Sequence, residues 1–197
     1  MATVYYTDWQ TPLSSVRLVS DGVSLLGLYF IGQRYFPTFS IHWEPMPDLA
    51  VFRLTQQQLS EYFHHQRQQF DLPLAPQGTA FQQQVWRSLC AIPYGQTISY
   101  RTMAHYLGQP NAARAVGAAN GRNPISIIIP CHRVIATNGN LTGYAGGVDR
   151  KQWLIQHEQA LPTHKSQQLI PNPRVVDTDR NSISLHSSGF DNPKSQI

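Results

Sequence analysis

Patterns of apolar and polar residues predict strands and a loop in the first part of the chain. Residues 15–20 (SVRLVS) alternate apolar with polar side chains, and residues 23–30 (VSLLGLYF) form a second strand-like run after Asp21-Gly22. Two such runs around Asp-Gly predict a β-hairpin. Three prolines within residues 37–47 then predict a loop.

A helix and a third strand are predicted to complete this N-terminal unit. Thr55 and Gln58 form a capping-box pattern, and apolar residues follow at loosely helical spacing: Leu59, Tyr62, Phe63 and Phe70. Residues 70–74 can return as a strand. The pair His64-His65 favours a solvated face over a metal site, because adjacent helical positions diverge by about 100°. We expect a small α/β domain without a catalytic pattern.

Boundary residues mark the start of the second half. Residues 73–78 (PLAPQG) predict a linker, after which Thr79 and Gln82 form a second capping-box pattern. An amphipathic helix should follow and end before Pro93. Its apolar positions are Phe81, Val85, Trp86 and Leu89. Cys90 lies at the edge of that stripe, where a buried, unreactive cysteine is favoured.

Two further short helices are predicted between residues 99 and 121. Ser99 is expected to cap the first, which Gly108 stops, and Asn111 is expected to cap the second, which ends near Gly121. A helix pair joined by a glycine-containing turn is typical of the helix-turn-helix motif. Such pairs are also common in folds that never touch DNA, so this pattern leaves the function open.

The second of these helices has one face that is almost without side chains. Arg114 shares that face with Gly117, Ala118 and Gly121, whereas Val116 lies about 200° round the helix. Small residues in this arrangement suit either tight helix packing or close approach to a ligand. The packing alternative is weakened, because an arginine at a dry helix contact is costly without a partner.

Charge and composition narrow the classes of function. The net charge of +4 is uneven, with −2 on residues 1–76, +5 on residues 77–162 and +1 on residues 163–197. The middle segment therefore suits contact with a polyanion, unless it is merely a basic domain. No apolar run approaches 18 residues and no secretory signal is recognisable, so no membrane span is expected. Two cysteines are too few for a disulfide scaffold and predict a reducing, cytoplasmic location.

Candidate chemistry is concentrated in residues 126–135 (SIIIPCHRVI). The apolar run predicts a buried strand that delivers Cys131 to its end. A free cysteine is only a few per cent thiolate at pH 7, and a neighbouring base or cation can raise that fraction. His132 is adjacent, and the acidic residues that could orient it between 77 and 162 are Asp149 and Glu158. A metal site is disfavoured, because no second cysteine is nearby.

Several motifs surround this cysteine in one unbroken order. They are FQQQVW, IPYGQTISY, AARAVGAANGRNP, IPCHRV, Asn138-Gly139, Gly143 to Gly147, Lys151-x-Trp153-Leu154 and His157-Glu158. In this order the chain closely resembles the O6-alkylguanine-DNA alkyltransferases (methylated-DNA–protein-cysteine methyltransferases), and most nearly the bacterial Ogt-type members. The resemblance extends from about Phe81 to Glu158, and residues 1–76 match the family's small α/β domain in pattern only.

The resemblance implies an α+β fold class and a single-turnover reaction. A small ribonuclease H-like α/β domain (residues 1–76) should precede a mostly helical, winged-helix-like domain with a helix-turn-helix (77–162). Residues 163–197 have no counterpart and are expected to form a polar, disordered tail. The family repairs DNA by moving an alkyl group from O6 of guanine, or less efficiently O4 of thymine, to a protein cysteine. The damaged nucleotide is flipped out of the helix first.

Catalytic roles are implied residue by residue. Cys131 is expected to accept the alkyl group, His132 to act as base through a bound water, and Glu158 to orient His132. Asn123 is expected to support the geometry of the site. Tyr100 is expected to rotate the phosphate of the target nucleotide and to donate a proton to the base. No cofactor is implied, because the lesion itself is the alkyl donor.

Binding roles are implied in the same way. Arg114 is expected to fill the space that the flipped base leaves in the stack. Positions that touch the DNA backbone in relatives correspond to Arg101, Gln109 and Thr137. The substrate pocket and its closing loop are expected to include Ser126, Val134, Leu141, Tyr144, Ala145 and Gly146.

Members of the family place the second helix of the helix-turn-helix in the minor groove of DNA. This placement would explain why the corresponding helix here has a face of small residues around Arg114. That groove is about 6 Å wide, whereas a helix with side chains measures about 10–12 Å. We therefore expect a monomer that binds double-stranded DNA carrying O6-alkylguanine through the minor groove, with no membrane partner. No metal is expected, because the N-terminal domain lacks the cysteine through which some relatives hold zinc.

Three alternative functions compete with this interpretation. A non-catalytic alkyltransferase-like protein would bind alkylated bases on the same fold, but such proteins replace the reactive cysteine. A helix-turn-helix regulator of another class would explain the basic segment but not residues 130–134 (PCHRV). A cysteine hydrolase would need an oxyanion hole, for which the sequence offers no pattern.

Overall fold

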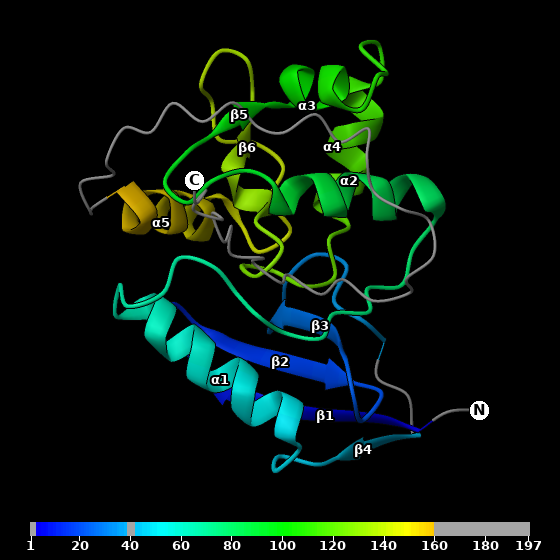
Figure 1. The fold of residues 1–197 in the computed structure, drawn as a ribbon, viewed down its shortest axis with the longest axis vertical. Helices are drawn as coiled ribbons and strands as arrows, with labels where there is room; N and C mark the ends of the chain where they lie inside the picture. Colours follow the sequence, from blue (N-terminus) through cyan, green and yellow to red (C-terminus); the bar gives the residue numbers. More distant parts are fainter. Residues whose placement is uncertain (1–2, 39–41, 160–197) are drawn as a thin grey trace, which may run out of the picture.

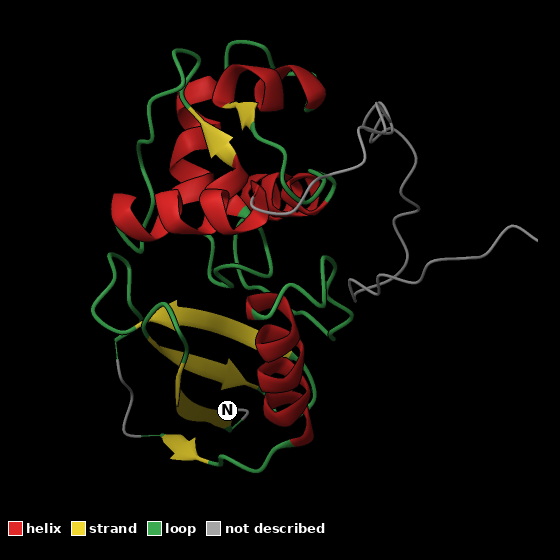
Figure 2. Ribbon diagram, turned by 90° about the vertical axis from the view of Figure 1, so that its left-hand side faces the viewer, coloured by secondary structure: helices red, strands yellow, loops and turns green. Residues whose placement is uncertain are grey.

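The computed structural model describes residues 3–38 and 42–159 and has the expected α+β architecture (Figure 1). A four-stranded sheet comes first, in the spatial order β3-β2-β1-β4. Its strands are β1 (Val4–Gln10), β2 (Ser15–Ser20), β3 (Leu25–Phe30) and β4 (Trp43–Pro45). Strand β2 is antiparallel to β1 and β3, and β4 is parallel to β1. Helix α1 (Ala50–Phe63) covers one face of this sheet (Figures 1 and 2).

The predicted hairpin is confirmed, since β2 and β3 pair through the Asp21-Gly22 turn. The Asp21 carboxylate accepts hydrogen bonds from the backbone N–H groups of Val23 and Ser24, and Gly22 adopts a φ of 102° that favours glycine. Strand β1 was not predicted from the sequence. The loop predicted at residues 37–47 is partly wrong, because β4 lies within it.

Two predictions for the rest of the N-terminal half are wrong. Helix α1 begins at Ala50, and Thr55 lies inside it, where its hydroxyl donates to the carbonyl of Val51 at 2.7 Å. A threonine can bond the helix backbone internally as well as cap it, so the pattern misplaced the start. Residues 70–74 form no strand either, because Leu74 makes only an isolated bridge to Leu25.

The C-terminal half is mostly helical (Figures 1 and 2). Its helices are α2 (Ala80–Cys90), α3 (Tyr100–Tyr106), α4 (Ala113–Gly121) and α5 (Val148–Gln159), with a 3₁₀ turn, η1, at Cys131–Arg133. Short strands β5 (Ile98–Ser99) and β6 (Val134–Ile135) pair in parallel. No helix in the described ranges is long and apolar enough to cross a membrane.

Three of the predicted helix boundaries in this half are confirmed. Thr79 and Gln82 form both bonds of a capping box on α2, and the Ser99 hydroxyl accepts from the N–H of Thr102 at the start of α3. Gly108, with a φ of 69°, follows α3. Asn111 does not cap α4, however, which starts after Ala112 without a side-chain cap.

The segment before the cysteine is a buried turn, so the predicted strand at residues 126–129 is wrong. The Asn123 side chain bonds both ends of this turn. Its amide nitrogen donates to the carbonyl of Ile129 at 2.7 Å, and its amide oxygen accepts from the N–H of Ile125 at 3.0 Å. Ile127 consequently has a φ of 71°, which is unusual for a β-branched residue. Backbone bonds from Leu28 to residues 124 and 126 attach this turn to the edge of β3. The N-terminal sheet thus supports the segment that carries Cys131.

Candidate active site

Cys131 is the first residue of η1 and is held from two sides by asparagine amides. Asn123 Nδ2 donates to Cys131 Sγ at 3.0 Å, and Asn120 Nδ2 donates to the Cys131 carbonyl at 3.2 Å. Only 4% of the residue is exposed, and this burial raises the pKa of the thiol to about 11 against the opposing effects of Asn123 and Lys151. The thiol is therefore protonated at neutral pH, and a nucleophilic role requires a base.

His132 is the adjacent base and is completely buried. Its Nε2 lies 2.8 Å from Glu158 Oε1. Because an ionised carboxylate only accepts hydrogen bonds, Nε2 must carry the hydrogen. Burial lowers the pKa of His132, although the Glu158 charge opposes this, so the ring is neutral at pH 7. Its Nδ1 is then an unprotonated acceptor, and it has no hydrogen-bond partner among the described residues.

Glu158 is fixed by donors from three parts of the chain, which are Tyr62, Gly95 and the adjacent pair His132 and Arg133. Arg133 Nε donates to its Oε2 at 2.8 Å and Arg133 Nη2 to its Oε1 at 2.9 Å. The Gly95 N–H donates to Oε2 at 3.1 Å, and the Tyr62 hydroxyl donates to Oε1 at 2.9 Å. Burial raises the pKa of the carboxyl, but His132 and Arg133 outweigh it and hold the pKa well below its usual range. Glu158 is therefore an anion at every pH where His132 can work as a base.

Tyr100 and Lys151 border the site on the side of the loop that follows β6. The Tyr100 hydroxyl donates to the Thr142 carbonyl at 3.0 Å, and Lys151 Nζ lies 3.5 Å from the same hydroxyl. Lys151 is fully buried and also donates to the carbonyls of Val134 and Thr142, at 2.7 and 2.9 Å. Burial lowers its pKa to about 8. The lysine thus ties β6 to the loop and places a positive charge near Cys131.

Of the expected pocket residues, Val134 is buried at the start of β6, and the others lie on the loop after β6 or on the turn before Cys131. Tyr144 and Ser126 are both buried, with 8% and 2% of each residue exposed. Gly146 packs so closely that an added Cβ would stand 2.7 Å from the Phe30 ring. Leu141 and Ala145 are half-buried, and the carbonyl of Ala145 accepts from the Arg34 N–H at 3.0 Å. The loop is therefore anchored to the N-terminal half.

The expected DNA-contacting residues lie apart from this centre, on the surface. Arg101, Gln109, Arg114 and Thr137 are all exposed. Helices α3 and α4 and the loop after β6 gather at one end of the molecule (Figure 1). On α4 the predicted division of faces holds: Val116, Ala119 and Asn120 are buried, while the side that carries Arg114 and Ala118 is exposed.

Four side chains at the centre were missed by the sequence analysis: Tyr62, Asn120, Arg133 and Lys151. Arg133 and Lys151 both stand within recognised motifs, and spacing alone marks the lysine, because Lys151, Leu154 and Glu158 share the buried face of α5. Tyr62 carries no such signal, since it lies 96 residues from Glu158 in the chain.

Comparison with known proteins identifies the class to which this fold and site belong. The DNA-binding domain of 6-O-methylguanine DNA methyltransferase matches residues 80–160, and the ribonuclease-like domain of the same proteins matches residues 4–76. The chain belongs to this family, whose members repair DNA by alkyl transfer. It is thus a DNA-binding methyltransferase.

Particular relatives agree with this placement. The methylated-DNA–protein-cysteine methyltransferase of Mycobacterium tuberculosis is 45% identical over 157 residues, which cover 80% of this chain and 93% of the relative. The crystal structure of the Mycobacterium tuberculosis O6-methylguanine methyltransferase superposes with a TM-score of 0.75, covering 81% of this chain and 96% of that one. A crystal structure of the Mycobacterium tuberculosis protein OGT in complex with DNA has 44% identity and a TM-score of 0.73, covering 79% of this chain and 93% of that one.

Proposed function

We propose that this protein transfers a methyl or other alkyl group from O6 of guanine, and more weakly from O4 of thymine, in double-stranded DNA to Cys131, once per molecule. The observation that carries the proposal is the buried series Cys131, His132 and Glu158. In it a protonated thiol stands next to a neutral imidazole, and the free nitrogen of that imidazole can take the proton.

The reaction then proceeds by one displacement with balanced proton movements. The thiol proton passes through a bridging water to Nδ1 of His132, and the anionic Glu158 stabilises the imidazolium that forms. The bond from Sγ to the alkyl carbon forms as the bond from O6 to that carbon breaks, and the electron pair stays on the guanine. The Tyr100 hydroxyl supplies the proton that yields neutral guanine. Burial raises the pKa of Tyr100, and the positive charge of the Lys151 ammonium, 3.5 Å away, would act in the opposite direction when the proton leaves.

The proposed product explains why each molecule acts once, and the nature of the alkyl donor explains why the proposed reaction uses no cofactor. Cys131 becomes a thioether, which ordinary acid–base side chains do not cleave. The lesion is itself the alkyl donor, so the bond that breaks is already present in the DNA.

Binding is proposed to place α4 in the minor groove, with the target nucleotide turned out into the pocket. The exposed, nearly bare face of α4 supports close approach to a groove about 6 Å wide. Arg114 would occupy the vacated space in the base stack, and Arg101, Gln109 and Thr137 would contact the backbone. Residues Ser126, Val134, Leu141, Tyr144, Ala145 and Gly146 would enclose the flipped base. Asn123 would hold the thiol in line with the alkyl carbon.

The remaining expectations belong to the same proposal. We expect a monomer with two working domains, 1–76 and 77–162, and a location in the cytoplasm, where both cysteines stay reduced. The expected tail, 163–197, lies outside the described residues.

The fate of the methyl group tests the proposal against its alternatives. Duplex DNA with a radiolabelled O6-methylguanine is incubated with the protein, and protein, DNA and small molecules are separated. The proposal predicts that label moves to protein until one equivalent is bound. Label that stays in the DNA would indicate a binding protein or a regulator, and released methanol would indicate a hydrolase.

A further inference from the structure

Tyr62 reaches the active site from the opposite half of the molecule. It lies in the last turn of α1, its ring is completely buried, and its hydroxyl donates to Glu158 Oε1 at 2.9 Å. The same oxygen accepts the hydrogen of His132 Nε2 at 2.8 Å. One carboxylate oxygen is therefore shared between the N-terminal half and the base.

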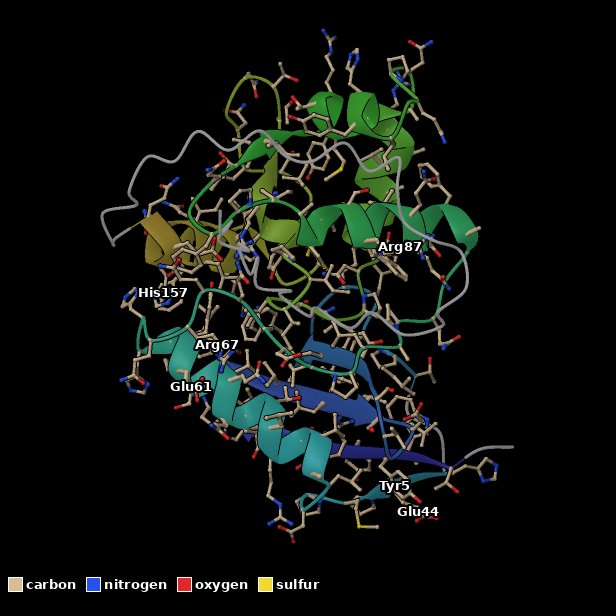
Figure 3. All side chains as sticks on the ribbon, viewed as in Figure 1. Tyr5, Glu44, Glu61, Arg67, Arg87 and His157 are labelled. Atoms are coloured by element: carbon tan, nitrogen blue, oxygen red, sulfur yellow. The ribbon has the colours of Figure 1, made fainter. Side chains whose placement is uncertain are left out.

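A second contact fixes the direction of this approach. The Tyr62 carbonyl lies 3.0 Å from His157 Nε2, so the two ends of one residue hold consecutive residues of α5. The His157 ring also stacks on Trp153, with centroids 4.8 Å apart, and on His65, with centroids 4.0 Å apart. Figure 3 shows His157 reaching from α5 toward the end of α1. The end of α1 thus holds α5 in one orientation about its axis, in which Glu158 faces His132.

We propose that Tyr62 is a positioning residue for alkyl transfer, whose hydroxyl limits how strongly Glu158 holds the proton-accepting His132. The inference rests on the proposed function, because it concerns the proton that His132 takes from Cys131. It adds a direct contribution of the N-terminal half to the chemistry at Cys131.

The sign of the effect follows from the shared oxygen. A donor on Oε1 withdraws negative charge from the bond to His132 and so disfavours the imidazolium. The charged groups that face His132 are Glu158 and Lys151 from α5 and Arg133, which follows His132 in the chain, and the substitution of Tyr62 removes none of them. Without the hydroxyl the pKa of His132 should rise, so more of the base is already protonated at mildly acidic pH.

The test is the pH dependence of single-turnover transfer by the full chain and by Tyr62→Phe. Phenylalanine keeps the ring packed and removes one hydrogen bond to an anion. We expect the acidic limb of the rate to move to higher pH by roughly half to one unit. In the same variant, nitrogen-15 NMR of the His132 ring should show the same rise in its titration midpoint.

Tyr94→Phe is the matched control. Its ring lies 6.1 Å from that of Tyr62, and its hydroxyl oxygen is buried but has no hydrogen-bond partner in the described chain. If Tyr62 has only a structural role, Tyr62→Phe should lower the melting temperature without changing the pH dependence of transfer. The acidic limb of its pH–rate profile would then coincide with that of Tyr94→Phe. That superposition would overturn the inference.

A variant of opposite sign keeps the inference testable if Tyr62→Phe folds poorly. Incorporation of 3-fluorotyrosine at position 62 makes the phenol a stronger donor, so the acidic limb should move to lower pH. An unmoved limb contradicts the inference while transfer to Cys131 by the unmodified protein still supports the proposed function. If the unmodified protein transfers no alkyl group at all, the proposed function itself fails.

Discussion

Replacing Arg133 by methionine should destabilise the protein more than any surface ion-pair change. The guanidinium makes two bonds to Glu158 at 2.8 and 2.9 Å and one to the carbonyl of Ile92 at 2.6 Å. The side chains of Arg133 and Glu158 are 7% and 2% exposed. The substitution leaves a buried anion with fewer donors and an unpaired carbonyl.

The expected magnitude follows from burial. Removing one partner of a buried ion pair costs about 3–5 kcal/mol of unfolding free energy. A protein of ordinary stability, about 5–15 kcal/mol, would lose a large fraction of it. Urea unfolding should therefore show a midpoint lower by roughly 2 M, given a slope of about 1–3 kcal/mol per molar urea.

Arg67→Met is the matched control. Arg67 pairs with Glu61 at 2.6 Å, but both side chains are more than a quarter exposed, and Figure 3 shows the pair at the edge of α1. An exposed pair of this kind contributes little to stability, because water and salt screen its charges. The reasoning is refuted if Arg133→Met costs no more than Arg67→Met. It also fails if the losses of unfolding free energy caused by Arg133→Met and Glu158→Gln simply add in the double variant. Side chains in contact should instead show a coupling energy of about 0.5–3 kcal/mol.

Four further outcomes are expected. Gly146→Ala should lower the unfolding free energy by about 1–3 kcal/mol, since the added Cβ would stand 2.7 Å from Phe30 and 2.9 Å from Tyr144. At Gly121 an added Cβ would meet no atom within 4 Å, so Gly121→Ala should stabilise α4 by up to about 1 kcal/mol. The same substitution should weaken DNA binding, as measured by fluorescence anisotropy. Arg114→Ala should slow transfer from paired duplex far more than from single strands, with Arg114→Lys intermediate on duplex, because an already loose base costs less to extrude; equal losses on both substrates would make Arg114 an ordinary phosphate contact. In denaturant titrations at several pH values, the unfolding free energy should fall as the pH drops below about 6.5 and again below about 4.3. The unfolded chain binds protons at His132 and Glu158 at higher pH than the folded chain does, and Glu158→Gln should flatten the second fall.

Local signals in the sequence predicted the elements that depend on local contacts. The Asp21-Gly22 turn and the Thr79 and Ser99 caps formed as expected, because each satisfies backbone groups within a few residues. The same type of pattern failed at Thr55, where the preceding residues continue the helix toward Ala50 and the hydroxyl bonds inside it.

Long-range contacts account for what the sequence did not predict. The isoleucines of residues 126–129 read as a strand, but the Asn123 side chain and the edge of β3 bend them into a turn. The order of motifs marked Cys131, His132 and Glu158, and the structure brings His132 and Glu158 into contact and Asn123 onto Cys131. Tyr62 could not be found in this way, because only tertiary packing joins it to Glu158.

The most direct test of the central claim is the intact and peptide mass of the protein after reaction with duplex DNA that contains O6-methylguanine. The account predicts a gain of one methyl group per molecule, located on Cys131, which stays after removal of the DNA. Cys90→Ser should give the same gain, since Cys90 is a separate thiol at the end of α2 that donates to the Trp86 carbonyl and makes no hydrogen bond to His132 or Glu158 in the described chain. Cys131→Ser should give none. A methyl group on Cys90, or full transfer by Cys131→Ser, would contradict the account.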